Sequence, residues 1–361
     1  MQRREALTLL AAAPLASAAD PLARALRSAP LLRRMASDPS FELQVLLTRY
    51  RVSGGFAPMA TYRHGVDDRR WFAAASFVKP LLAMLVLEAL TRSGLSATLD
   101  KLWLHLEGSS CAPLPSLPAK LSDLFAHMLV VSDNPSFNAL YELIGSDALH
   151  ARLAALGMGE VRIPQRLGCA IAAPSKLRAR LIDDHGTTRF VSDASGPQAA
   201  QRFPFGAASK GRAWLQNGQR IEGPHDFSAS NFVPLSVVHQ WIATIGRADT
   251  GRFEIDAALR QRLRAWMSQR PRDIGQAKPD DHSKWLIAPR DSVTVVSKNA
   301  QSFGYIGDSA FVAGRSFAFA LSAILFVDRD GVLNDARYAY DEIGRPFLKA
   351  LGEAVLEIER K

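Results

Sequence analysis

The sequence lacks the compositional biases that mark fibrous or unstructured chains. It has no collagen-like period, no sustained heptad pattern and no low-complexity tract. Of its 361 residues, 48% are apolar, which is enough for a well-buried core and argues against disorder over most of the length. The chain is therefore expected to fold as a globular protein.

Long apolar runs are also absent. The stretch at residues 317–327 is mostly apolar, but it is far shorter than the roughly 20 residues that a membrane-crossing helix needs. The patterns of phosphate loops, dinucleotide-binding folds, G-x-S-x-G hydrolases and H-E-x-x-H metalloproteases are missing too. We therefore predict no membrane span, no cofactor and no metal site.

Positive charge is in excess, but no basic run gathers it. The formal net charge is +9, and the surplus is mostly arginine scattered along the chain. Scattered basic residues usually lie on solvated faces, and no nucleic-acid-binding motif accompanies them. Nucleic acid is therefore not predicted as a partner.

The first residues are typical of an export signal. Arg3 and Arg4 precede an Ala-rich apolar stretch that ends in the small-x-small pattern of residues 16–18. The paired arginines favour the twin-arginine route, so residues 1–18 are interpreted as a signal peptide and the mature protein as periplasmic or secreted. A frayed basic N-terminus of a cytosolic protein is the alternative. Cysteine is scarce, and Cys111 and Cys169 could pair in an oxidising compartment, but the sequence leaves this open.

Strand-like segments occur near both ends of the chain, with helical patterns between them. This arrangement predicts an α+β fold: one antiparallel sheet formed by the N- and C-terminal segments, interrupted by an all-helical subdomain at about residues 96–290, all within one domain at residues 19–361. Residues 162–233 show little periodicity and are expected to form an irregular segment that is either functional or disordered. The predicted helices cover 22–37, 76–91, 122–131, 138–144, 147–156, 235–245, 257–269 and 345–359, and the predicted strands cover 42–50, 58–64, 292–297, 305–312 and 317–327.

The candidate nucleophile is Ser76, with Lys79 as its base. A spacing of three residues on a helix places the hydroxyl and the amine on one face. A serine hydroxyl needs a neighbouring base to become a good nucleophile, and a lysine can act as one if burial and a nearby positive charge lower its pKa. The pair opens an apolar helix that tolerates Pro80 only in its first turn.

Two further polar elements follow. Ser132, Asp133 and Asn134, with Asn138 after them, lie between helical segments, where they could either face a cleft or simply cap a helix. Lys298 lies at the end of a predicted strand and is followed by Asn299, Ala300 and Gln301. A lysine at that place could bind a substrate carboxylate or be only a solvated charge.

The three elements together resemble the S-x-x-K, S-D-N and K-T-G signature of class A β-lactamases and penicillin-binding proteins. The resemblance covers residues 40–361. It implies that Ser76 is acylated after Lys79 takes its proton, that Ser132 relays a proton and that Asn134 orients the acyl amide. It further implies that Lys298 faces the substrate carboxylate and that the backbone N–H groups of Ser76 and Gln301 form an oxyanion hole.

Two departures from the family pattern affect the expected activity. Ala300 replaces the family's glycine, so a Cβ narrows the approach along the strand edge. The E-x-x-L-N loop, whose Glu activates the deacylating water in class A enzymes, is missing. The acids after the S-D-N element, among them Glu160, Asp183, Asp184 and Glu222, lack its flanking residues. Slow deacylation, as in a penicillin-binding protein, is therefore expected.

Three functions remain open at this point. The chain could hydrolyse β-lactams, act as a D-Ala-D-Ala peptidase or esterase, or bind cell-wall fragments without catalysis. The expected partner is a β-lactam or a peptidoglycan-derived small molecule, and the expected oligomeric state is a monomer. Fold alone does not decide among these functions.

Overall fold

A computed structural model describes residues 20–169, 175–249 and 251–361. The predicted signal peptide at residues 1–18 lies outside this part of the chain. Within it, no helix combines the length and apolar character needed to span a membrane.

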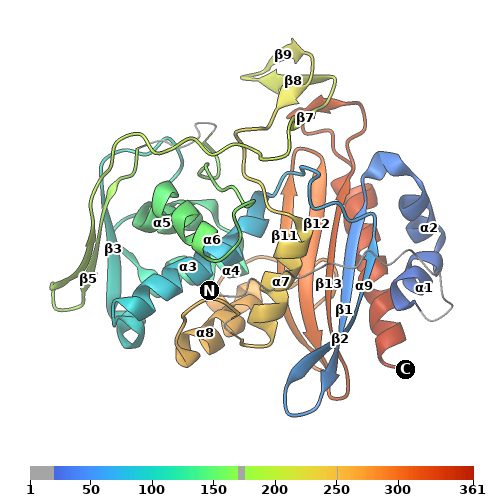
Figure 1. Cartoon of the computed structure of the whole chain (residues 1–361), viewed down its shortest axis with the longest axis horizontal. Coiled ribbons are helices and arrows are strands. Elements are labelled where there is room, and N and C mark those ends of the chain that lie inside the picture. The colour runs from blue at the N-terminus through green and yellow to red at the C-terminus, as the bar shows by residue number, and fades with distance from the viewer. Residues whose placement is uncertain (1–19, 170–174, 250) are drawn as a thin grey trace, which may run out of the picture.

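A five-stranded antiparallel sheet forms the centre of the molecule (Figure 1). Two strands come from the N-terminal part and three from the C-terminal part, in the order β11-β12-β13-β1-β2. β1 joins the two parts because it pairs with β13 on one side and β2 on the other. The prediction of one sheet formed from both ends of the chain is confirmed. The strands are β1 (Gln44–Val52), β2 (Phe56–His64), β11 (Thr294–Ser302), β12 (Tyr305–Ala313) and β13 (Ala318–Phe326).

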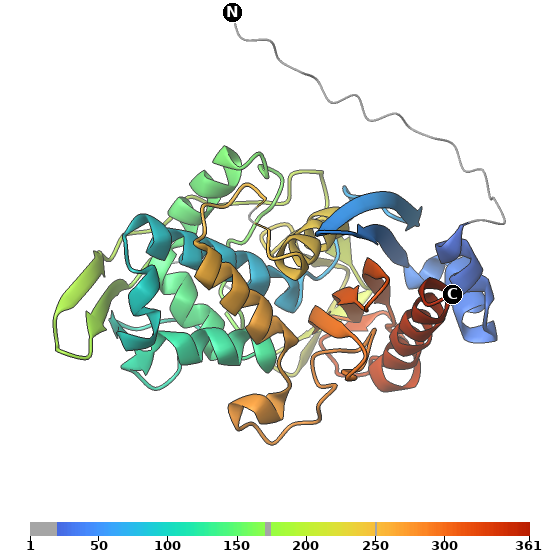
Figure 2. The same ribbon diagram turned by 90° about the horizontal axis from the view of Figure 1, so that it is seen from below.

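The two faces of this sheet carry separate apolar cores. On one face, α1 (Pro21–Arg27), α2 (Pro30–Ser37) and α9 (Arg345–Glu359) pack together and cover the strands. The other face is covered by α7 (Leu235–Gly246) and the helical part of the chain (Figure 2). β12 and β13 are almost wholly buried because both of their faces are covered.

The N-terminal helix prediction is wrong in one respect. Residues 22–37 do not form one helix, because the chain is extended at Ala29 and a second helix begins at Pro30. A proline disfavours helical backbone in the residue before it, and its missing N–H costs nothing at a helix start.

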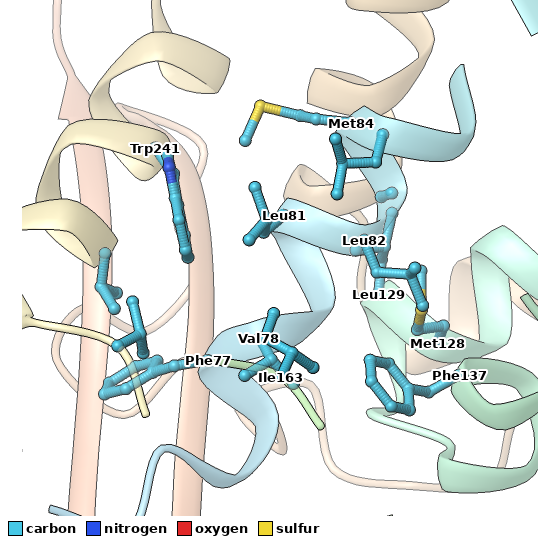
Figure 3. Packing of buried hydrophobic residues seen from close by; sticks show 14 of the residues in the cluster. Phe77, Val78, Leu81, Leu82, Met84, Met128, Leu129, Phe137, Ile163 and Trp241 are labelled. Atoms are coloured by element: carbon cyan, nitrogen blue, oxygen red, sulfur yellow. The ribbon is translucent and has the colours of Figure 1, made fainter. Parts of the chain in front are cut away.

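The helical part is built around the long apolar helix α3. This helix is buried on nearly all sides, as its sequence predicts. Figure 3 shows Phe77 and Val78 of the turn before this helix, with Leu81, Leu82 and Met84 of the helix itself. They lie between Trp241 of α7 and Met128, Leu129 and Phe137 of neighbouring helices. The helices are α3 (Lys79–Arg92), α4 (Leu121–Val130), α5 (Asn134–Ile144), α6 (Ser146–Ala155) and α8 (Ala257–Ser268).

The inserted part of the chain is not all-helical, and residues 162–233 are not simply irregular. A second sheet, in the order β4-β3-β5-β6, packs at the far end of the helices from the central sheet (Figure 1). These strands were missed because they are short and mostly half-exposed, so they leave only a weak alternation in the sequence. This sheet consists of β3 (Leu102–Glu107), β4 (Ala119–Lys120), β5 (Arg178–Asp183) and β6 (Thr188–Ser192). Two smaller sheets are formed by β7 (Ser209–Lys210) with β10 (His225–Asp226), and by β8 (Ala213–Gln216) with β9 (Gln219–Glu222) and β14 (Val332–Leu333).

Two loops beside α5 are tied to each other. Cys111 and Cys169, whose pairing the sequence left open, form a disulfide. Asn138, buried on α5, donates to the carbonyls of Pro113 and Leu167 and accepts from the N–H of Leu167. The loop before α4 and the loop after α6 therefore share one covalent and one hydrogen-bonded link.

Candidate active site

Ser76 lies in a tight turn that leads into α3. The turn is the 3-10 helix η2 (Ala75–Val78), and the α-helix itself begins at Lys79, three residues later than the sequence predicts. A 3-10 turn is common at a helix N-terminus because its first N–H groups have no intrahelical partners. Ala75 has a φ of +43°, a conformation that an L-residue seldom adopts. Because Phe77 and Val78 are fully buried, they hold the turn in place.

Lys79 places its amine among four polar oxygens from three residues. Its side chain is buried, and its Nζ donates to Ser76 Oγ at 3.0 Å and to Asn134 Oδ1 at 2.7 Å. It also contacts the carbonyl oxygen and the hydroxyl of Ser132, at 2.5 and 3.2 Å. These contacts fix the amine beside the hydroxyl that it would deprotonate.

The Ser132 loop combines helix capping with a site function. Asp133 caps α5 by accepting from the N–H and the hydroxyl of Ser136. Ser132, in a left-handed conformation (φ +61°), points instead toward the nucleophile and donates to Ser76 Oγ at 2.8 Å. The element therefore contains both a helix cap, Asp133, and a residue that faces Ser76, whereas the catalytic role of Ser132 remains a prediction.

Lys298 reaches the same group from β11. This strand is an edge of the central sheet and packs against the η2 turn. The Nζ of Lys298 donates to Ser132 Oγ at 2.8 Å and to Asn299 Oδ1 at 3.0 Å. Ser76, Lys79, Ser132 and Lys298 thus form one connected chain of hydrogen bonds. The strand continues through Gln301 rather than ending at residue 297 as predicted.

Burial controls the charge of both lysines. It lowers the pKa of Lys79 well below its usual value, and the positive charge of Lys298 lowers it further. Burial, with help from the Lys284 charge, also lowers the pKa of Lys298 to about 7, against the opposing effect of Asp308. The neutral amine that a general base requires is therefore favoured at Lys79.

The residues after Lys298 shape the edge of the site. Ala300 is buried on the same face of β11 as Lys298, because side chains alternate along a strand. The side chain of Gln301 is exposed, and its Oε1 lies 3.5 Å from the Nη2 of Arg345. The oxyanion-hole role of the Gln301 N–H remains a prediction.

Four charged or titratable residues near the site went unnoticed in the sequence. Asp308 on β12 is fully buried and accepts from the backbone N–H groups of Trp285 and Leu286. Lys278 and His282 come from the loop between α8 and β11, and Arg345 begins α9. None belongs to a short motif, and only the folded chain brings Asp308 and His282 near Lys298, Lys278 beside His282 and Arg345 beside Gln301.

The acids that the sequence singled out lie elsewhere. Asp183 and Asp184 are at the turn between β5 and β6, where they accept from loop N–H groups and from the Trp103 ring. Glu222 pairs with Arg220 on β9. Glu142, which follows the Ser132 loop on α5, is buried against Arg166. In the described ranges, no group of three or more His, Cys, Asp or Glu side chains could hold a metal ion.

The comparisons with known proteins agree with this architecture. Residues 60–189 match the model of the beta-lactamase enzyme family. No curated protein sequence is significantly similar to the chain.

Several solved structures similar to this one are β-lactamases. One from Sphaerobacter thermophilus DSM 20745 is 18% identical, with a TM-score of 0.53 over 94% of this chain and 97% of the other. A class A enzyme from Bacteroides cellulosilyticus DSM 14838 is 12% identical, with a TM-score of 0.56 over 94% and 99%. One from Burkholderia vietnamiensis is 18% identical, with a TM-score of 0.52 over 93% and 94%. The fold predicted from the three motifs is confirmed.

Proposed function

Because the chain is β-lactamase-like in fold and in its matched segment, we propose that it is a serine hydrolase that forms an acyl-enzyme on Ser76. The substrates are β-lactams or related amides and esters of the cell wall. The observation that carries the proposal is the 3.0 Å contact between Ser76 Oγ and the Nζ of Lys79, a buried amine of lowered pKa.

Acylation follows from the order of the hydrogen bonds. Lys79 takes the proton of Ser76, and Oγ forms a bond to the substrate carbonyl carbon. As the tetrahedral intermediate collapses, the C–N bond of the amide breaks. Ser132 contacts Ser76, Lys79 and Lys298. It delivers its proton to the leaving nitrogen and recovers the proton that Lys79 took from Ser76. Lys298 holds the substrate carboxylate through a charge-assisted hydrogen bond.

Deacylation is proposed to be slow. Asp133, whose charge acts on Lys79, already accepts two hydrogen bonds as the cap of α5. Glu142 is committed to Arg166 and to the N–H of Leu177. An acyl-enzyme without a carboxylate base to activate water has a long lifetime, as in a penicillin-binding protein.

Intact-protein mass spectrometry during incubation with penicillin tests the proposal. We expect the protein to gain the mass of one penicillin, on Ser76, and to lose it slowly. Ser76→Ala should gain nothing. A folded wild-type protein that stays unmodified at millimolar penicillin would overturn the proposal.

A D-Ala-D-Ala peptidase or esterase activity is the second candidate. It is favoured because the carboxylates of Asp133 and Glu142 already have hydrogen-bond or ion-pair partners. The matched comparison is nitrocefin hydrolysis against hydrolysis of an acyl-D-Ala-D-Ala peptide and a p-nitrophenyl ester. Turnover of the peptide or ester with only a single burst of nitrocefin would favour this candidate.

The protein is further proposed to act in the periplasm, following the signal predicted at residues 1–18. Fractionation of cells that express the full chain would test this location. A variant in which both Arg3 and Arg4 are lysine should remain in the cytoplasm if the twin-arginine route is used.

A further inference from the structure

A cavity lies beside the loop that carries Ser132. It has a volume of about 570 Å³ and lies between the outer face of α4 and two loops, within the usual size of small-molecule sites. Two of its lining residues, Val131 and Asp133, flank Ser132 in the chain. We call it the α4 pocket, and its polar lining includes Lys120, His127, Asp133 and Lys278.

The α4 pocket and the proposed reaction are related through Ser132, whose two chain neighbours line the pocket. In the proposed acylation, Ser132 protonates the leaving nitrogen, so the leaving group departs on the side of Ser132. The α4 pocket begins at the residues on either side of Ser132. A leaving group longer than one residue can therefore extend into it.

Lys278 is one of two lysines that line the pocket. It is exposed, and among the described residues no carboxylate lies within ion-pair distance of its amine. Its neighbour is the His282 ring, with 3.4 Å between Nζ and Nε2. Burial, followed by the charges of Lys278 and Lys298, lowers the pKa of His282. This shift favours the neutral imidazole ring.

Two acids, Asp123 and Asp133, also line the pocket, and no ion pair joins either of them to Lys278 among the described residues. Asp133 accepts two hydrogen bonds as a helix cap, and Asp123 lies in the first turn of α4. The charge of Lys278 also acts on Lys79. Its neighbour His282 accepts through its carbonyl from Asn299, which in turn contacts Lys298. An unpaired ammonium in the lining of a polar pocket is suited to a carboxylate ligand.

We infer that the α4 pocket is a leaving-group subsite, in which Lys278 binds a second carboxylate beyond the one held by Lys298. This inference rests on the proposed function. It narrows the substrate class to amides or esters whose leaving group is longer than one residue and carries a second anion. The bond that breaks and the path of the proton are those of the acylation described above.

The test uses two acyl-D-alanyl thioesters of equal leaving-group length. One releases mercaptoacetyl-glycine and the other mercaptoacetyl-aspartate, so they differ by one carboxylate. The second-order rate constant for acylation of Ser76 is followed by thiol release and by intact mass. We expect the wild-type protein to prefer the aspartate compound by about tenfold, the value of one charge-assisted contact.

The variants isolate the charge of Lys278. Lys278→Ala should abolish the preference and Lys278→Glu should reverse it, whereas Lys349→Ala, which removes an exposed lysine from α9 on the opposite face of the sheet, should keep it. The ratio of the two rates cancels any effect of Lys278 on Lys79, because both substrates need the same base.

The failures of the two proposals are distinguishable. Equal rates for the two thioesters in a protein that penicillin acylates at Ser76 would overturn the subsite and leave the hydrolase proposal standing. A protein that neither thioester nor penicillin acylates would overturn both.

Discussion

At the scale of single residues, the chemistry depends on two buried amines with different tasks. Lys79 has to be neutral to accept a proton, whereas Lys298 has to be charged to bind a carboxylate. Burial lowers both pKa values, and the charge of Lys298 lowers the pKa of Lys79 further. Ser132 contacts both amines. Asp308, fully buried on β12, acts in the opposite direction on Lys298 and keeps its pKa higher than burial alone would.

The pH dependence of acylation follows from these two lysines. Lys298 has a pKa of about 7 in the free protein, so it carries its positive charge below that pH and loses it above. Acylation by a substrate with a carboxylate should therefore fall above pH 7, by up to about tenfold per pH unit. On the acidic side, the rate should fall as Lys79 becomes protonated. Stopped-flow measurement of the second-order acylation rate from pH 5 to 9 checks this.

An uncharged p-nitrophenyl ester is the control for that profile. This ester needs Lys79 as a base but has no carboxylate for Lys298. Its acylation rate should therefore still fall at acidic pH but should not fall above pH 7. A fall of equal size for both substrates would assign the basic limb to another group.

At the scale of elements, the sequence predicted the central sheet, α3 and α9 well, because these segments have strong periodicity and are deeply buried. It missed the break between α1 and α2, since the apolar pattern continues across Pro30. It also missed β3 and β5, whose pairing is settled by contacts between distant segments and not by local preference.

The candidate active site was likewise predicted only in part. Ser76, Lys79, Ser132, Asn134 and Lys298 belong to short motifs, and the fold brings all five together. Lys278, His282 and Asp308 belong to none. The path of the loop before β11 sets where Lys278 and His282 lie. The register of β12 against β11 places Asp308 opposite Asn299. Single-sequence patterns do not contain that register.

The link between the two loops beside α5 yields a prediction about stability. The Cys111–Cys169 disulfide closes 58 residues of chain, and the entropy of that closure is worth up to about 4 kcal/mol. The double variant Cys111→Ser/Cys169→Ser should lose free energy of unfolding of that order, measured by urea titration. Wild-type protein titrated with a reductant should match the double variant.

Asn138 provides the matched comparison on the same two loops. Asn138→Ala leaves the carbonyls of Pro113 and Leu167 and the N–H of Leu167 without their partner, which should cost about 1–3 kcal/mol. An unchanged urea midpoint in both the Asn138 variant and the reduced protein would show that the loops are held by other contacts.

At the scale of the whole molecule, the active site is assembled from segments far apart in the chain. Ser76 and Lys79 come from the η2 turn and α3, and Ser132 comes from the loop before α5. Lys298 comes from β11, an edge strand of the central sheet. The core around α3 and the core under α9 share that sheet between them. No single helical or strand unit of the described chain contains the four groups.

This shared construction predicts that acylation and global structure are lost together. In a urea titration, the fraction of protein that labelled penicillin acylates should follow the circular dichroism signal with the same midpoint. Leu351→Ala tests the coupling from a distance, because Leu351 is fully buried under the sheet face opposite Ser76. We expect this variant to lose about 3 kcal/mol and to shift both curves equally. If labelling disappeared at a lower urea concentration than the circular dichroism signal, the site would open locally, and the helical part would be a separate unit of stability.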